Sequence, residues 1–203
     1  MLSQLPDDAV AEVAFAGRSN AGKSSAINTI TRSKTLARTS KTPGRTQLIN
    51  HFTVTEGRYL VDLPGYGYAK VSKSQQKHWG TTLSRYLAER EPLKCLIVVM
   101  DIRHPLTDTD WQMLELQQTG YAELHCLLTK ADKLGKSRAQ KALLDTRNQL
   151  EQAGIEASLQ TFSALKEEGV KDAHTVLDSY LYPSRGKPSQ THMADGPDSP
   201  SDQ

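Results

Sequence analysis

Short apolar runs alternate along the chain with longer segments that have the character of helices. Residues 12–16 (EVAFA), 93–100 (LKCLIVVM) and 124–128 (LHCLL) are apolar at most positions, as buried strands of a parallel sheet are. Helices are predicted near residues 73–90, 108–118, 137–153 and 169–181, and one more is predicted to begin near Gly22. This alternation predicts an α/β fold.

Local signals refine this pattern. Ser72 with Gln75, and Thr107 with Asp110, have the spacing of helix-opening caps.

A turn at residues 56–57 (EG) separates apolar runs at 48–54 and 59–61, which predicts a hairpin and therefore one antiparallel strand. A short strand is also predicted at 157–162. The fold class that we predict is a Ras-like, doubly wound α/β domain with a six-stranded mixed sheet, helices on both faces and ligands at the carboxyl ends of the strands.

Composition limits the number of domains. The chain has 203 residues, of which 37% are hydrophobic and 24% charged, enough for one sizeable core. We assign residues 1–182 to one domain and expect residues 183–203, rich in Pro, Ser, Gly and Asp, to be a disordered tail. Cys95 and Cys126 lie in apolar runs and are expected to be reduced core residues.

Two absences bear on location. No run of 18 apolar residues occurs, and the N-terminal MLSQLPDD lacks a secretory pattern. We therefore expect a cytoplasmic protein that makes no contact with a membrane, and we expect it to be a monomer.

Residues 17–24 read GRSNAGKS, which is a GxxxxGKS phosphate loop directly after a predicted strand. Gly17 and Gly22 allow backbone angles that let successive amides converge on a phosphate, and the following helix adds its positive end. Lys23 supplies a charge for the β- and γ-oxygens, and the Ser24 hydroxyl is placed to ligate Mg²⁺. The segment predicts that the substrate is a nucleoside triphosphate.

The base is predicted from residues 129–132 (TKAD), which end a buried strand. The Asp132 carboxylate can accept two hydrogen bonds from the N1–H and the exocyclic amine of guanine, whereas adenine would present an acceptor to it. The aliphatic stem of Lys130 would lie along the base, and residues 161–164 (TFSA) fit a loop that offers amides to the guanine oxygen. These elements predict a strong preference for GTP.

The middle of the chain predicts a switch. Asp62 follows an apolar strand and begins the sequence DLPG, so it can hold a magnesium-bound water while the Gly65 amide reaches the γ-phosphate. Residues 42–47 (TPGRTQ) form a polar loop in which Thr46 is the candidate to complete the magnesium shell. A simple turn punctuated by Pro43 and Gly44 is the alternative for that loop.

Together, GRSNAGKSS, SKTPGRTQLIN, VDLPGYGYA, MDIRHP and LLTKADK resemble the EngB (YihA or YsxC) GTPases, bacterial relatives of the Era and TrmE group, over about residues 12–181. The resemblance implies a slow, Mg²⁺-dependent GTPase that acts in assembly of the large (50S) ribosomal subunit and is linked to septation and cell division. It implies that Ser24 and Thr46 bind the metal and that Lys23, Thr46 and Gly65 act in hydrolysis. The implied nucleotide-binding residues are Gly17, Arg18, Ser19, Asn20, Ala21, Gly22, Lys23, Ser24, Gly44, Arg45, Thr46, Gln47, Leu48, Asp62, Leu63, Pro64, Gly65, Thr129, Lys130, Ala131, Asp132, Phe162, Ser163 and Ala164.

The chain departs from this pattern in two places. It begins only sixteen residues before the phosphate loop, which leaves open a lost or displaced first strand. Thr129 stands where guanine-reading loops more often have asparagine, although the EngB family tolerates threonine there.

Two further features leave alternatives open. Residues 17–58 contain eight basic residues against one acid, either as a face for ribosomal RNA or as an ordinary solvated surface. Asn20 could help to hold a potassium ion against the phosphates, as the TrmE group does, or could only hydrogen-bond within its turn. Tyr66 follows Gly65 where Ras-like enzymes carry a water-orienting glutamine, so slow intrinsic turnover is expected.

Three functions are compatible with these residues. The first is a GTP-hydrolysing factor that binds ribosomal RNA and proteins of the large subunit or its precursor. The second is a signalling or septation regulator that binds a protein partner without RNA. The third, a small-molecule kinase, is the weakest because Asp132 and the Thr46 loop would have no task in it.

Overall fold

The structure is a computed structural model that describes residues 5–37, 49–66 and 73–183, with side chains from residue 80 onward in the helix that begins at residue 73. Its elements, in chain order, are β1 (Ala11–Gly17), α1 (Lys23–Ile30), β2 (Asn50–Thr55), β3 (Arg58–Asp62), α2 (Lys73–Glu89), β4 (Leu93–Asp101), α3 (Asp108–Gln117), β5 (Glu123–Thr129), the short 3-10 helix η2 (Ala131–Lys133), α4 (Lys136–Gln152), β6 (Ser158–Thr161) and α5 (Val170–Leu181).

The six strands form one sheet in the order β2-β3-β1-β4-β5-β6. β2 runs antiparallel to β3, and all other neighbours are parallel. The predicted six-stranded mixed sheet is therefore confirmed. A lost or displaced first strand is excluded, because β1 pairs with both β3 and β4 near the centre of the sheet.

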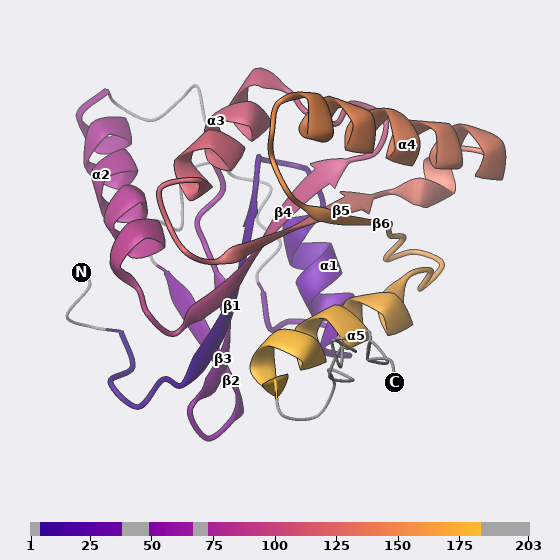
Figure 1. The fold of residues 1–203 in the computed structure, drawn as a ribbon. Helices are drawn as coiled ribbons and strands as arrows, with labels where there is room; N and C mark the ends of the chain where they lie inside the picture. The colour runs from indigo at the N-terminus through magenta and orange to yellow at the C-terminus, as the bar shows by residue number, and fades with distance from the viewer. Residues whose placement is uncertain (1–4, 38–48, 67–72, 184–203) are drawn as a thin grey trace, which may run out of the picture.

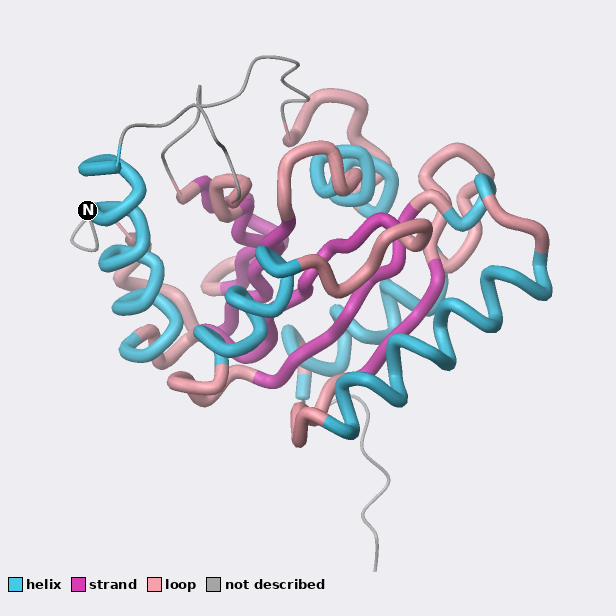
Figure 2. The backbone as a smooth tube through the Cα atoms, turned by 90° about the horizontal axis from the view of Figure 1, so that it is seen from above, coloured by secondary structure: helices cyan, strands magenta, loops and turns pink. Residues whose placement is uncertain are grey.

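Helices cover both faces of the sheet (Figures 1 and 2). Along β4, Leu96, Val98 and Met100 pack with residues of α2, α3 and α4, whereas Ile97 and Val99 pack with residues of α1 and α5. Because successive side chains of a strand point to opposite faces, a strand between two helical layers must be apolar at nearly every position. This requirement explains the nearly continuous apolar run of residues 93–100.

Predicted details of the elements can be compared with the structure. The cap at Thr107 is confirmed, since its backbone amide donates to Asp110 Oδ2 at 3.0 Å in a capping box. Cys95 and Cys126 are free and buried, as predicted, and burial raises the pKa of both thiols.

The predicted cap at Ser72 lies outside the described residues. Nearly all of the tail does too, so its disorder stays a prediction. No helix in the described ranges is long and apolar enough to cross a membrane.

A charged residue interrupts the apolar core at Glu12, which is fully buried in β1. Its carboxylate accepts hydrogen bonds from Tyr86 Oη at 2.8 Å and from Arg90 Nη2 at 2.5 Å, both at the end of α2. His51 Nε2 on β2 lies 3.5 Å from Glu12 Oε1. Burial alone would raise the pKa of this carboxyl, but the interactions with His51, Arg90 and Tyr86 lower it to about 2.

We expect Glu12 to make the free energy of unfolding depend on pH. A carboxyl whose pKa falls from 4.5 to about 2 on folding contributes about 3 kcal/mol, fully present above pH 4.5 and lost as the pH falls towards 2. The difference in unfolding free energy between the unmodified protein and Glu12→Gln should therefore narrow over that range, as urea denaturation can measure. Glu89→Gln, at an exposed helix ion pair, is the control and should change little. A difference that stays constant with pH would contradict this role.

Candidate nucleotide-binding site

The phosphate loop connects the end of β1 to the start of α1. Asn20 and Gly22 have φ values of 63° and 96°, in the left-handed region, and Gly22 is the N-cap of the helix. A Cβ on Gly17 would lie only 3.0 Å from the carbonyl oxygen of Val99, so the loop needs a glycine there to pass so close to β4. The loop and the N-terminus of α1 thus have the form that binds phosphate.

Lys23, the first residue of α1, forms an ion pair with Asp62 at the end of β3. Both side chains are nearly buried, with exposed fractions of 11% and 12%. Since β1 and β3 are parallel neighbours, their carboxyl ends bring the phosphate loop and the DLPG segment together. The Lys23 ammonium group and the Asp62 carboxylate therefore neutralise each other's charge.

The end of β5 is fastened to the phosphate loop by two side chains. Thr129 Oγ1 hydrogen-bonds to the carbonyl oxygen of Ala21 and, at 3.0 Å, to that of Met100. Lys130 Nζ donates to the carbonyl oxygen of Asn20 at 2.6 Å. The predicted base-reading and phosphate-binding segments are thus joined directly.

Lys130 is held in turn by Asp101, at the end of β4. Lys130 Nζ lies 2.9 Å from Asp101 Oδ2, and the same carboxylate accepts a hydrogen bond from Arg103 Nη2 at 2.6 Å. Burial raises the pKa of Asp101, but the hydrogen bonds from Arg103 and Lys130 outweigh it and hold the pKa well below its usual range. Asp101 therefore stays charged and keeps the Lys130 side chain next to the loop.

Asp132 lies in η2, just beyond β5, and meets the loop that follows β6. Ser163 Oγ donates to Asp132 Oδ1 at 2.7 Å, and this hydrogen bond is the main reason that the pKa of Asp132 is lowered. The amide of Ala131 donates to the carbonyl oxygen of Phe162 at 3.0 Å, and Phe162 is fully buried. Ala164, the third predicted member of this loop, follows and is partly exposed. The two predicted base-contact segments are therefore in contact.

A ribosome-binding GTPase model and several relatives match this chain. The family model described as "50S ribosome-binding GTPase" matches residues 12–130. A probable GTP-binding protein EngB of Xylella fastidiosa (strain 9a5c) is 54% identical over 179 residues, which cover 88% of this chain and 88% of the relative. One of Methylobacillus flagellatus is 52% identical over 181 residues, covering 89% and 87%.

The chain belongs to the EngB family of GTP-binding proteins.

Solved structures agree with this fold. A crystal structure of a probable GTP-binding protein engB superposes with a TM-score of 0.67 at 19% identity, covering 84% of this chain and 98% of the other. Era in complex with MgGDPNP and nucleotides of 16S ribosomal RNA gives a TM-score of 0.66 at 19% identity, covering 89% of this chain and 59% of Era. At these identities the likeness shows the fold alone.

Part of the predicted site of this EngB-family chain lies outside the described residues. Gly44, Arg45, Thr46, Gln47 and Leu48 all do, so the loop around Thr46 stays a prediction.

The remainder of the predicted site is described. Ser24 is half-buried in the first turn of α1, and Leu63 and Pro64 are buried behind Gly65. The described residues contain no group of three or more His, Cys, Asp or Glu that could hold a metal by themselves.

Two buried carboxylates beside the loop, Asp101 and Asp110, are not predicted as site residues from the sequence. In the sequence, Asp101 stands within the family motif MDIRHP, and Asp110 is predicted only as part of a helix cap. An acidic residue at the end of an apolar strand, as Asp101 is, was the available signal, because a carboxylate is seldom buried there without a partner.

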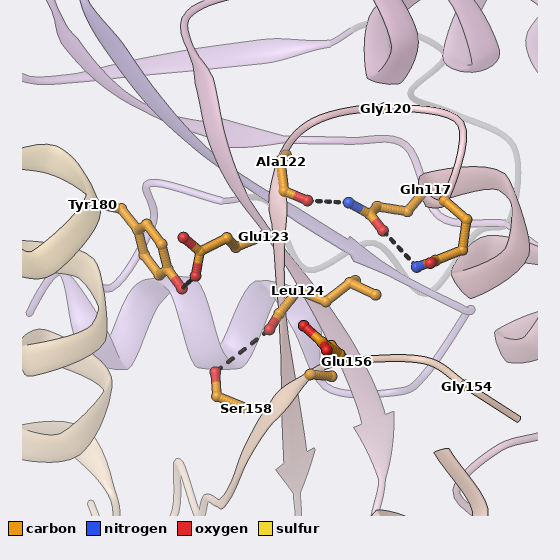
Figure 3. A pocket seen from close by; sticks show the side chains of 11 residues that line it. Gln117, Gly120, Ala122, Glu123, Leu124, Gly154, Glu156, Ser158 and Tyr180 are labelled. Atoms are coloured by element: carbon orange, nitrogen blue, oxygen red, sulfur yellow. Dashed lines mark hydrogen bonds between the residues drawn. The ribbon is translucent and has the colours of Figure 1, made fainter. Parts of the chain in front are cut away.

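A hollow of about 880 Å³ opens at the opposite edge of the sheet, where β5 and β6 begin (Figure 3). Tyr180 Oη donates to Glu123 Oε2 at 2.9 Å on its wall, and Gln118 Nε2 donates to Gln117 Oε1 at 3.0 Å. None of the predicted nucleotide-binding residues lines this hollow. This hollow is therefore separate from the described part of the predicted nucleotide site.

Proposed function

We propose that this protein binds GTP together with Mg²⁺ and hydrolyses the GTP to GDP as a switch in the cytoplasm. The observation that carries this proposal is the Asp132 carboxylate, kept charged and oriented by Ser163 at the edge where the phosphate loop lies. A carboxylate there accepts from the two donors of guanine, and Lys23 with the amides of the loop receives the phosphates.

Two described side chains suit Mg²⁺, which prefers oxygen ligands. Ser24 is the second residue of α1 and offers a hydroxyl, and Asp62 is the last residue of β3 and offers a carboxylate. Mg²⁺ held there would neutralise charge on the phosphate oxygens. Lys23 would then leave Asp62 for the phosphates, and Thr46 is proposed to complete the metal shell.

The residue after Gly65 does not have the geometry to orient the attacking water. Tyr66 Oη donates to the fully buried carboxylate of Asp110 at 3.0 Å, and Tyr66 carries no amide with which to hold a water as glutamine does. We therefore expect slow intrinsic turnover of GTP, which a cation bound beside the phosphates would accelerate.

We expect GTP hydrolysis to be faster in potassium than in sodium at equal ionic strength, by about tenfold or more. The Asn20 side chain is exposed beside the phosphate loop and has no hydrogen-bond partner among the described residues, so its oxygen can contact a cation there. Asn20→Ala should remove the potassium effect and leave GDP affinity nearly unchanged, as phosphate release and fluorescent-nucleotide titration can measure. Asn148→Ala, on the exposed side of α4, is the control. Equal rates in both salts, alone and with 50S subunits, would make Asn20 a turn residue only.

We further propose that the GTP-bound form acts in assembly of the 50S subunit and thereby supports normal septation. The description of the matching family model supports this partner, as do Arg32 and Lys34, which are exposed just after α1. Arg58 is held within the protein instead, because its Nε donates to the carbonyl oxygen of Leu181 at 2.7 Å and its guanidinium lies over the ring of Tyr182.

Co-sedimentation with isolated 50S subunits tests this role. Binding with a non-hydrolysable GTP analogue that weakens with GDP, and that decreases with salt, is the expected result. No binding in either state would favour the alternative, a signalling or septation regulator that acts through a protein partner. We also propose that the protein is a monomer, which its rate of sedimentation without subunits can test.

A further inference from the structure

Three segments far apart in the sequence meet behind the proposed γ-phosphate contact. They are Arg18 in the phosphate loop, Tyr66 after the DLPG segment, and Asp110 in the first turn of α3. Arg18 and Tyr66 form an isolated parallel β-bridge, with the Tyr66 amide 3.4 Å from the carbonyl oxygen of Gly17 and the Ser19 amide 3.4 Å from that of Tyr66. The backbone around Gly65 is therefore attached to the phosphate loop.

The Asp110 carboxylate is the fixed point of this cluster because it is fully buried. Its Oδ2 accepts hydrogen bonds from the amide and the hydroxyl of Thr107, at 3.0 and 2.7 Å. Its Oδ1 accepts from Tyr66 Oη at 3.0 Å. A carboxylate held by its own helix cap cannot follow a moving partner, so it defines where the phenol must lie.

Within the part of the chain that the structure describes, Arg18 is the cationic side chain that forms an ion pair with this carboxylate. Its Nε lies 3.8 Å from Asp110 Oδ2, is buried and has no hydrogen-bond partner, while its Nη2 lies 3.4 Å from the carbonyl oxygen of His104. Because a buried carboxylate is costly without a positive charge nearby, the partly exposed Arg18 stabilises the burial of Asp110. Burial and the nearby Asp110 also raise the pKa of the Tyr66 phenol, which stays protonated as a donor.

We propose that Tyr66, Asp110 and Arg18 are positioning residues that fix the Gly65 amide for the γ-phosphate and so set the preference for GTP over GDP. The proposal rests on the proposed function in one respect, namely that Gly65 contacts the γ-phosphate. GDP lacks that phosphate, so its affinity does not depend on where Gly65 lies. A loss confined to the triphosphate is therefore the signature of this role.

Tyr66→Phe tests the proposal with the smallest change. It removes one hydroxyl, keeps the ring, and leaves Asp110 with its bonds from Thr107. We expect affinity for a non-hydrolysable GTP analogue to fall roughly tenfold and GDP affinity to change less than about twofold. Arg18→Gln, at a side chain that is 26% exposed, is a second variant. Its affinity for the GTP analogue, divided by its affinity for GDP, should also fall.

Tyr86→Phe is a matched control at the other end of the sheet. It removes a hydroxyl that donates to the fully buried carboxylate of Glu12 at 2.8 Å, so the lost interaction is of the same kind. Both phenylalanine variants should lose thermal stability, and only Tyr66→Phe should change the ratio of the two affinities. An unchanged ratio in Tyr66→Phe, or an equal change in Tyr86→Phe, would overturn the proposal. Failure of the unmodified protein to bind GDP would instead overturn the proposed function.

Discussion

Replacing Asp132 by asparagine is expected to lower GTP affinity by roughly 10⁴-fold and to favour xanthine nucleotides, because the amide donor meets the carbonyl that xanthine carries in place of the exocyclic amine. The structure supports a clean substitution. Ser163 Oγ donates to Asp132 Oδ1, and the oxygen of an asparagine can accept the same bond, so the loop after β6 keeps its anchor. Titration with fluorescent GTP and XTP analogues measures the change.

Asp145→Asn is the control for this exchange, since Asp145 is exposed on α4 and belongs to neither base-contact segment. It should leave both affinities unchanged. Equal binding of GTP and ATP by the unmodified protein would refute the role given to Asp132.

The second large effect is expected at Lys23. Lys23→Ala removes a nearly buried charge from the phosphate-binding position, which should weaken GTP binding by about 2–5 kcal/mol, or roughly 30-fold to several thousand-fold. The variant should stay folded, because it leaves no hydrophobic cavity, although Asp62 loses its ion-pair partner and some stability with it. Nucleotide titration together with circular dichroism separates the two effects.

Lys141→Ala, on the exposed surface of α4, is the matched control for the loss of a lysine. Near-normal GTP binding by Lys23→Ala would show that the loop does not bind phosphate in the expected way.

The order of strands and helices could be predicted from the sequence because the physics involved is local. A strand between two helical layers must be apolar on both sides, as β4 is, and a hairpin needs a turn such as Glu56–Gly57. The phosphate loop is also a local feature, because its strand, glycines and helix are consecutive. The capping box of Thr107 and Asp110 spans only four residues.

Partners far apart in the chain could not be predicted in this way. Glu12 looks like an interruption of a strand until Tyr86 and Arg90 are seen to reach it from the end of α2. The sequence predicts Asp110 as part of a helix cap, but its hydrogen bond with Tyr66 depends on the packing of α3 beside the DLPG segment. The sequence predicts that Asp62 holds a magnesium-bound water, but it does not predict the ion pair that Asp62 forms with Lys23.

Thr129 and Lys130 connect two parts of the site that a nucleotide must bridge. Because they bond to the carbonyl oxygens of Ala21 and Asn20, the end of β5 and the phosphate loop form a single rigid frame. The span between the guanine position and the phosphate position is then set by the protein before any ligand arrives. Such a frame selects ligands by length: it accepts a molecule with base and phosphates at the right separation, and discriminates against one whose linking sugar is longer or shorter.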